Sequence, residues 1–223
     1  MLKFGADGVK KMYAGEVPIK TAYAGAALVF DGGTPSRLPE GYTEVEYIEC
    51  TDNKFSISAG IVGGGTYSLE LEVYITDPGL SGSHHIITTN STVREKFSVY
   101  NTTQSRLFYL VRSGGYTDSG ITTYKKKVSI VYSATDNALY LNGKKMNNST
   151  LSEPVHPRLG SYDQSYSAEM RIHSCKSYHT TGVVMCDLVP CINPEKVVGL
   201  YDIEHGKFYQ NLKTGNVIPG PAV

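Results

Sequence analysis

Tyr67-Ser68-Leu69-Glu70-Leu71-Glu72-Val73-Tyr74-Ile75 alternates apolar and polar side chains along its whole length. Successive side chains of an extended strand point to opposite faces, so the apolar members share one face and the glutamates share the other. The stretch therefore predicts a half-buried β-strand. Similar alternation supplies further inward faces for the same core at Phe55, Ile57, Ala59 and Ile61, and at Val128, Ile130 and Tyr132.

The residue composition favours strands and tight turns. The chain has 223 residues with 23 Gly, 17 Tyr and no Trp. Strand signals recur at the short spacing typical of a sandwich or barrel, and no segment carries the apolar period of a long helix. Asn142-Gly143 predicts a tight hairpin turn, because both residues tolerate positive φ. Glu204-His205-Gly206 predicts a second hairpin, and we expect an all-β protein.

The charge balance excludes some partners. Lys+Arg and Asp+Glu both number 21, so the formal net charge is zero and the basic surface of a nucleic-acid-binding protein is missing. Zero net charge also permits copies of the chain to associate. The N-terminus lacks the apolar stretch of a signal peptide. The longest mostly apolar run, Ala22 to Phe30, is too short for a membrane helix of roughly 20 residues, so no membrane insertion is expected.

A ten-residue repeat marks the N-terminal part of the chain. Val9-Lys10-Lys11-Met12-Tyr13-Ala14-Gly15 returns as Ile19-Lys20-Thr21-Ala22-Tyr23-Ala24-Gly25. Two such short β-prone units cannot bury a core, so we interpret residues 1–35 as a docking module and linker, followed by one domain at 36–223. A linker rich in Gly and Pro runs from Asp31 to Gly41. The predicted attachment residues are Val9, Lys10, Tyr13, Gly15, Ile19, Lys20, Tyr23 and Gly25.

Three groups of segments, in order along residues 38–221, carry a family resemblance. The first is Leu38-Pro39-Glu40-Gly41-Tyr42-Thr43-Glu44-Val45-Glu46-Tyr47-Ile48-Glu49, and the second is Val128–Tyr132 with Ala138–Lys145. The third comprises Met170–Lys176, Asp187–Cys191, Val198–Asp202, Gly206–Asn211 and Pro219–Pro221. They resemble concanavalin A-like (laminin-G-like) jelly-roll domains of bacteriophage and prophage virions of gut bacteria. The N-terminal repeat is similar to segments of phage tail and head-fibre proteins.

Several residues are candidates for catalysis or metal binding. Glu70 and Glu72 lie at alternate positions of one strand, as the acid and the nucleophile of a jelly-roll glycosidase do. A third acidic residue at the next such position is missing, so we interpret them as ordinary glutamates on the solvent side of the strand. His84-His85 should point to opposite faces of a strand. The four cysteines, Cys50, Cys175, Cys186 and Cys191, show no zinc-knuckle spacing and are expected to be free thiols. Related domains often carry calcium, but no acidic run places it here, so no metal ligand and no cofactor are assigned.

Loops rich in Tyr, Asp, Asn and Ser are the remaining candidates for binding. A Tyr ring can stack on the apolar face of a sugar while carboxylates and amides bond its hydroxyls. The candidate ligand residues are Tyr116, Asp118, Tyr162, Asp163 and Tyr166, and ordinary solvated turns are the alternative at each loop.

The resemblance and the two-part organisation together imply a non-enzymatic virion protein, assembled in the cytoplasm of a host bacterium. Its N-terminus would dock on other virion proteins of the tail, a fibre or the head. Its sandwich would be displayed as a symmetric homo-oligomer, with a trimer favoured. It would adsorb to a glycan on the host surface. The alternatives are a carbohydrate-binding module of a bacterial surface protein and, third, a jelly-roll glycan hydrolase.

Overall fold

The computed structural model describes the backbone of residues 12–14, 17–19, 21–24, 27–31, 37–77, 83–89, 96–102, 106–112, 116–123, 125–146, 151–162 and 166–223. Side chains are described from residue 37 onward within these ranges, except at 83, 96, 97, 101, 102 and 112. The chain forms two units, Met1–Pro39 and Glu40–Val223.

The larger unit is a two-layered β-sandwich of the jelly-roll class, and every regular element in its described residues is a strand. This confirms the all-β prediction. One layer has the order β15 (Lys144–Lys145), β14 (Ala138–Leu141), β13 (Lys126–Ser133), β8 (Tyr67–Asp77), β18 (Glu169–His179), β19 (Val184–Ile192), β20 (Val198–Asp202) and β21 (Lys207–Gln210). Strand β6 (Ile48–Cys50) joins this layer beside β18, β22 (Val217–Pro219) lies beside β6, and β5 (Thr43–Glu44) lies beside β19.

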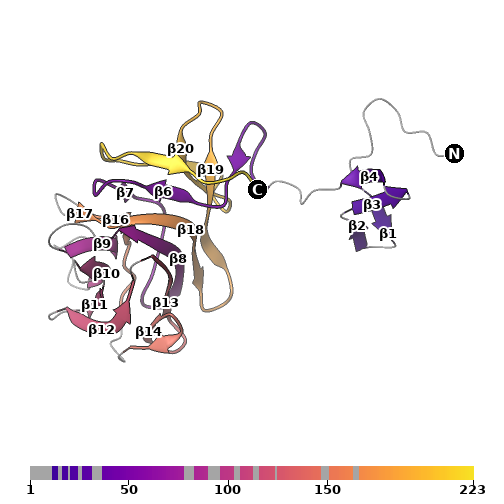
Figure 1. Ribbon diagram of the computed structural model, residues 1–223. Helices are drawn as coiled ribbons and strands as arrows, with labels where there is room; N and C mark the ends of the chain where they lie inside the picture. The colour runs from indigo at the N-terminus through magenta and orange to yellow at the C-terminus, as the bar shows by residue number, and fades with distance from the viewer. Residues whose placement is uncertain are drawn as a thin grey trace. The chain divides into compact units, whose positions relative to one another are not determined.

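The second layer contains seven strands, and Figure 1 shows its strands β9 to β12 as a group separate from β8, β13 and β18. Its order is β12 (Thr117–Thr122), β11 (Arg106–Arg112), β10 (Lys96–Thr102), β9 (Ser83–Thr88), β16 (Arg158–Gly160) and β7 (Ser56–Ile57), with β17 (Tyr166–Ser167) parallel to β9. The other pairings are antiparallel. The described residues contain no helix long and apolar enough to cross a membrane.

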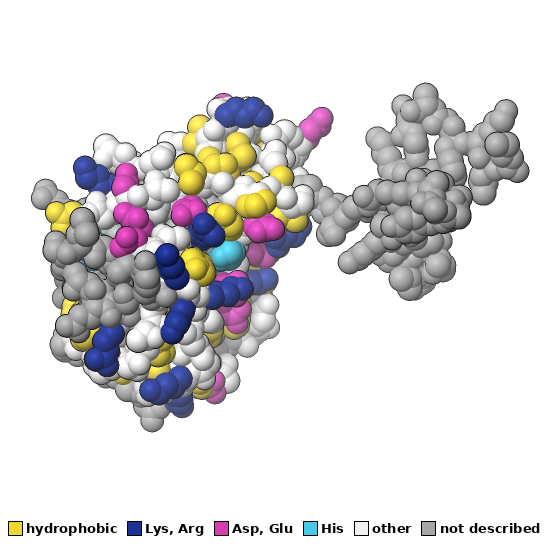
Figure 2. Space-filling model, viewed as in Figure 1, with side chains coloured by type: hydrophobic (Ala, Val, Ile, Leu, Met, Phe, Trp, Pro, Cys, Tyr) yellow, Lys and Arg dark blue, Asp and Glu magenta, His cyan; other side chains and the backbone are white. Residues whose placement is uncertain are grey.

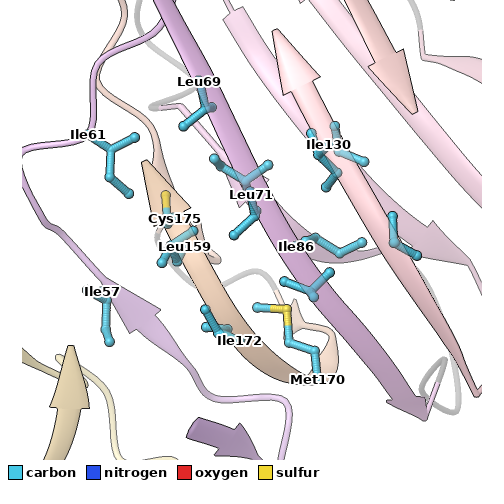
Figure 3. Close-up of a cluster of buried hydrophobic side chains, with 14 of the residues drawn as sticks. Ile57, Ile61, Leu69, Leu71, Ile86, Ile130, Leu159, Met170, Ile172 and Cys175 are labelled. Carbon is cyan, nitrogen blue, oxygen red and sulfur yellow. The ribbon is translucent and has the colours of Figure 1, made fainter. Parts of the chain in front are cut away.

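The core lies between the two layers and follows the alternation seen in the sequence. Leu69, Leu71, Val73 and Ile75 of β8 are all buried in it, as predicted, and Tyr67 is half-buried. Figure 3 shows side chains from both layers filling this space: Leu71, Ile130, Ile172 and Cys175 from one layer and Ile57, Ile86 and Leu159 from the other. Phe55, Ile57, Ala59 and Ile61 also reach the core, although regular pairing there is limited to the two residues of β7.

Both predicted hairpins are confirmed. Asn142 and Gly143 have φ of 50° and 74°, and they connect β14 to β15 as the type I′ turn requires. Strands β20 and β21 pair antiparallel around the turn that contains Glu204 to Gly206.

The two ends of the larger unit are paired with each other in one antiparallel ladder. Strands β6 and β22 pair in register from Cys50 opposite Val217 to Ile48 opposite Pro219. The ladder continues through Gly220, whose N–H donates to the Tyr47 carbonyl at 2.8 Å, and through Glu46, whose N–H donates to the Pro221 carbonyl at 2.9 Å. The first and last segments of the sandwich therefore hold each other in place.

Asn211 connects the end of β21 to the other layer. Its side-chain oxygen accepts hydrogen bonds from the backbone N–H of Ser56 (2.9 Å) and Lys213 (3.1 Å). Its amide nitrogen donates to the carbonyls of Gly215 (2.9 Å) and Lys54 (3.1 Å). One amide side chain thus uses both its acceptor and its donors to join the segment 211–215 to the segment 54–56.

We predict that Asn211→Ala lowers the free energy of unfolding by about 2–3 kcal/mol, since it leaves several partly buried backbone groups without partners. Urea unfolding of the purified protein measures this loss. Asn216→Ala is the matched control, because no hydrogen bond of the Asn216 side chain is part of this junction, and it should change stability by less than about 0.5 kcal/mol. Equal effects of both variants would contradict the role given to Asn211.

The smaller unit contains two hairpins in its described residues. Strand β1 (Met12–Ala14) pairs with β2 (Val17–Ile19), and β3 (Thr21–Ala24) pairs with β4 (Ala27–Asp31). Three of the predicted attachment residues, Tyr13, Ile19 and Tyr23, lie in these strands. The other five lie outside the described residues: Val9, Lys10, Gly15, Lys20 and Gly25.

Candidate functional site

The outer face of the smaller sheet carries a row of aromatic residues. Val99 of β10 and Leu107 of β11 point into the core, so the next residues, Tyr100 and Phe108, point to the outer face. The strand register places His85 of β9 opposite Tyr100, and Tyr100 opposite Phe108. Asp118 of β12 lies opposite Phe108 and completes a row across four neighbouring strands.

The rings in this row are packed against one another. Tyr100 stacks on Phe108 with ring centroids 5.5 Å apart and an interplanar angle of 21°. The Tyr116 ring meets Tyr100 edge-on at 4.5 Å, and the His85 ring lies 5.9 Å from Tyr100. Tyr100 is itself buried, while the Tyr116 side of the cluster faces solvent. We call these four residues, His85, Tyr100, Phe108 and Tyr116, the aromatic platform.

Tyr116 combines exposure with a fixed orientation. It remains 45% exposed, although its edge-on contact with Tyr100 restricts the ring. An ion pair flanks the platform: Arg106 Nη2 lies 2.8 Å from Asp118 Oδ2. Asp118 Oδ1 also accepts a hydrogen bond from the Gly120 N–H at 2.8 Å, which orients the carboxylate. An exposed ring beside oriented donors and acceptors is an arrangement that suits a polyhydroxylated ligand.

The other predicted ligand residues lie elsewhere. Tyr166 of β17 is 48% exposed and stacks on His84 at 5.8 Å, on the side of β9 opposite to His85 and the platform. The Tyr162 ring lies 4.3 Å below the Arg158 guanidinium. Asp163 lies outside the described residues. The structure therefore brings Tyr116 and Asp118 together and separates both from Tyr166.

Glu70 and Glu72 lie on the outer face of the larger sheet, and each has a partner there. The Tyr178 hydroxyl donates to Glu70 Oε1 at 2.6 Å, and this hydrogen bond is the main cause that raises the pKa of Tyr178 to about 12. Lys127 Nζ lies 2.7 Å from Glu72 Oε1. Both carboxylates thus take part in pairs at the surface of the sheet.

Other charges on this outer face are paired in the same way. Arg171 Nε lies 2.9 Å from Glu49 Oε2, and its guanidinium lies over the Tyr47 ring at 4.6 Å. Lys176 Nζ lies 3.2 Å from Asp187 Oδ2. Figure 2 shows acidic and basic side chains interspersed over the face that it presents.

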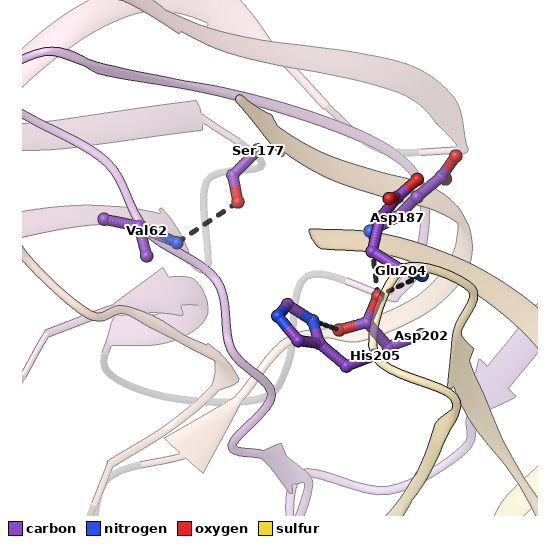
Figure 4. Close-up of polar contacts among 6 residues, drawn as sticks. All are labelled: Val62, Ser177, Asp187, Asp202, Glu204 and His205. Carbon is purple, nitrogen blue, oxygen red and sulfur yellow. Dashed lines mark hydrogen bonds and ion pairs between the residues drawn. The ribbon is translucent and has the colours of Figure 1, made fainter. Parts of the chain in front are cut away.

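A buried carboxylate and a histidine also occur together in the turn after β20. Asp202 is fully buried and accepts hydrogen bonds from the N–H groups of Asp187 and Glu204 and from Nδ1 of His205, which lies 2.7 Å away. Figure 4 shows that Ser177 is turned toward the Val62 N–H and not toward His205. The Asp202–His205 pair therefore lacks a hydroxyl nucleophile at Ser177, and its contacts stabilise the β20–β21 turn.

All four cysteines are free and buried, as expected from the sequence. Burial is the first cause that raises the pKa of each thiol, to about 12 for Cys191. Within the described ranges, no three or more His, Cys, Asp and Glu side chains are grouped as a metal site would require. His84 and His85 have separate partners, the Ser167 carbonyl and the Ser98 hydroxyl.

We predict that the native protein reacts with a disulfide reagent such as dithionitrobenzoate at pH 8 far more slowly than a free cysteine does. The raised pKa values keep the thiols protonated at this pH, and burial excludes the reagent. The same assay in denaturant should titrate all four cysteines. Rapid modification of any thiol in the folded protein would contradict the buried arrangement.

Sequence reasoning missed most of the aromatic platform. Strand β11, Arg106–Arg112, is apolar on both faces, so its alternation does not distinguish an outer Phe108 from a core Leu107. The aromatic residues of this strand were the signal that could have revealed the platform. A strand that is apolar on both faces has its outer face either covered by other residues or used for binding.

Comparison with known protein families gives no match, and comparison with curated proteins gives none either. Comparison with solved structures gives β-sandwich proteins of low similarity to this chain. A protein assigned as a β-glucanase from Mycobacterium abscessus matches with a TM-score of 0.37 and 10% identity, over 53% of this chain and 66% of that chain. A heptameric SAP-like pentraxin from Limulus polyphemus matches with a TM-score of 0.39 and 11% identity, over 80% of this chain and 93% of that chain. These likenesses concern the β-sandwich alone.

Proposed function

We propose that this chain is a non-enzymatic attachment and display protein of a bacteriophage virion. Residues 1–39 dock on a larger assembly, and the sandwich presents the aromatic platform to a glycan on the host surface. The observation that carries the binding half of the proposal is the exposed Tyr116 ring, held edge-on by Tyr100 beside the Arg106–Asp118 pair. The docking half is supported by the separation of the chain into two units and by the fibre-like repeat.

A neutral sugar ring suits this site. One face of a pyranose is apolar and can stack on the Tyr116 ring, while the Asp118 carboxylate accepts hydrogen bonds from hydroxyls and the Arg106 guanidinium donates to ring or hydroxyl oxygens. Because the ring and the carboxylate are already oriented, binding costs little side-chain entropy. Each contact is modest, so firm adsorption depends on several copies that bind at once.

The proposal assigns no catalysis to the sandwich. A glycosidase needs two carboxyl groups that face the same bond, one of them protonated at the start of the reaction. Glu70 and Glu72 are paired with Tyr178 and Lys127 on the outer face of the larger sheet, and the platform lies on the other sheet with Asp118 paired to Arg106. These contacts support a binding role in place of hydrolysis.

We predict that Tyr116→Ala weakens binding to neutral glycans about two- to thirteenfold, since an aromatic contact contributes about 0.5–1.5 kcal/mol. An array of immobilised neutral polysaccharides, followed by titration of the best binder, measures the change. Tyr166→Ala is the matched control: its exposure is similar, but its ring stacks on His84 away from the platform. This variant should bind as the unmodified protein does.

Three results would contradict the binding proposal. The first is that the protein binds no polysaccharide of the array. The second is that Tyr166→Ala loses affinity while Tyr116→Ala does not. The third is that the purified protein shortens the polysaccharide that it binds.

We predict that deletion of residues 1–39 abolishes incorporation of the protein into particles. The remaining sandwich should accumulate in the lysate in folded form, because the residues of its hydrophobic core cluster and of its terminal ladder lie within residues 40–223. Immunodetection in purified particles and circular dichroism of the truncated protein test the two statements. Particles that carry the truncated chain would contradict the docking role.

A further inference from the structure

Positive charge is concentrated in strands β13 and β15 of the larger sheet. The segment from Ser119 to Ser152 contains five lysines and one acidic residue, Asp136. The chain as a whole has equal numbers of acidic and basic residues, so this imbalance is local. All five lysines are exposed, and we call them the lysine surface: Lys125, Lys126, Lys127, Lys144 and Lys145. Figure 2 shows several Lys and Arg side chains in the lower part of the view, where Figure 1 places β12 and β14.

The hairpin of β13 and β14 separates these lysines from Asp136. Asp136 lies in the turn that connects the two strands, where its carboxylate accepts hydrogen bonds from the hydroxyls of Ser133 (3.0 Å) and Tyr140 (3.2 Å). At the other end of the hairpin, the turn that precedes Lys144 lies beside the first residues of β13. There the Ser129 N–H donates to the Asn142 side-chain oxygen at 2.8 Å, and the Asn142 N–H donates to the Ser129 carbonyl at 2.9 Å.

Carboxylates compensate only part of this charge. Lys127 is paired with Glu72, whereas Lys126 donates to a neutral group, the Thr122 hydroxyl, at 3.0 Å. Lys144 and Lys145 form no ion pair with any of the residues that the structure describes. Cations gathered without counter-charges produce a positive potential, which attracts an anionic partner.

Thr122 connects the lysine surface to the aromatic platform. It lies opposite Arg106 in the pairing of β11 with β12, and its hydroxyl accepts the hydrogen bond from Lys126. Arg106 in turn forms the ion pair with Asp118 that flanks the platform. Basic groups therefore continue from the edge of the platform onto β13.

We propose that the glycan bound by this chain carries anionic groups, phosphate or carboxylate, which lie on the lysine surface while a neutral ring of the same polymer stacks on Tyr116. This inference rests on the proposed function, because it extends the ligand that the platform is proposed to bind. A lysine ammonium is a point charge that donates to phosphate and carboxylate oxygens alike. The surface therefore selects for the charge of the polymer.

The charges at the platform favour a polysaccharide over a nucleic acid as this polymer. A single-stranded nucleic acid carries a phosphate beside every stacked base. Arg106 is already paired with Asp118, so this pair has no net charge with which to attract a phosphate next to the ring on Tyr116. In a polysaccharide, neutral and anionic units can follow one another along the chain, so that each meets the surface that suits it.

Binding of the full chain to dextran, carboxymethyl-dextran and phosphorylated dextran tests the inference. Both charged polymers should bind more tightly than dextran, and this gain should shrink as the ionic strength rises. Lys144→Gln/Lys145→Gln should weaken binding to the charged polymers about two- to thirtyfold, the range for two exposed ion pairs, and leave binding to dextran unchanged. A gain confined to one charged polymer supports the inference and assigns the anionic group.

Lys196→Gln/Lys207→Gln is the matched control. It removes the same charge from two exposed lysines in and near β20 and β21, at the opposite end of the sheet from β15, and should bind all three polymers as the unmodified chain does. Equal losses in both double variants, or charged polymers that bind no better than dextran, would overturn the inference. Tighter binding to an oligothymidylate than to phosphorylated dextran would overturn it in favour of a nucleic acid.

Tyr116→Ala distinguishes a failure of the platform from a failure of the lysine surface. It should weaken binding to the charged polymers and to dextran by the same factor, because the stacked ring is neutral in each. If Tyr116→Ala has no effect while Lys144→Gln/Lys145→Gln removes the gain, the proposed platform is contradicted and the lysine surface is supported. If the gain persists in Lys144→Gln/Lys145→Gln, the lysine surface is contradicted whatever Tyr116→Ala does.

Discussion

The antiparallel ladder between the first and last segments of the sandwich is the constraint on which the larger unit depends. It places Ile48 and Cys50 of β6 in the core while β6 pairs with β18 on one side and β22 on the other. Both ends of the unit are therefore fixed by each other, through backbone pairing that lies within residues 40–223. The proposed docking and the proposed ligand binding then belong to separate parts of the chain.

The two outer faces of the closed sandwich have different chemistry. The larger sheet presents carboxylates and cations in pairs, such as Glu72 with Lys127, and paired surface charges of this kind keep the face solvated. The smaller sheet presents rings that pack on one another, with Tyr116 outermost. The exposed Tyr116 ring on a sheet face beside the Arg106–Asp118 pair is the physical basis for proposing a ligand site there.

The local pattern of the sequence was sufficient to predict part of the fold. The alternation of β8 predicted its buried face because one side of that strand faces solvent, and Asn142-Gly143 predicted its turn because positive φ is a local requirement. Buried positions from Phe55 to Ile61 were also found, although pairing there is short.

The platform was only partly predictable, because it depends on pairing between distant segments. Tyr116 and Asp118 are predicted from loop composition, whereas Phe108 belongs to a strand that is apolar on both faces and Tyr100 belongs to a strand of mixed composition. Only the register of β9 to β12 brings these side chains into one row. The same limit applies to Asn211, whose partners lie more than 150 residues away at Lys54 and Ser56.

Native-state hydrogen exchange of the backbone amides tests the closed sandwich most directly. The amides of Glu46 and Gly220, which join the two ends, should exchange only through global unfolding, with the same free energy as the amide of Val73 in the central strand β8. Exchange of Glu46 and Gly220 through a local opening of much lower free energy, while Val73 stays protected, would contradict the account.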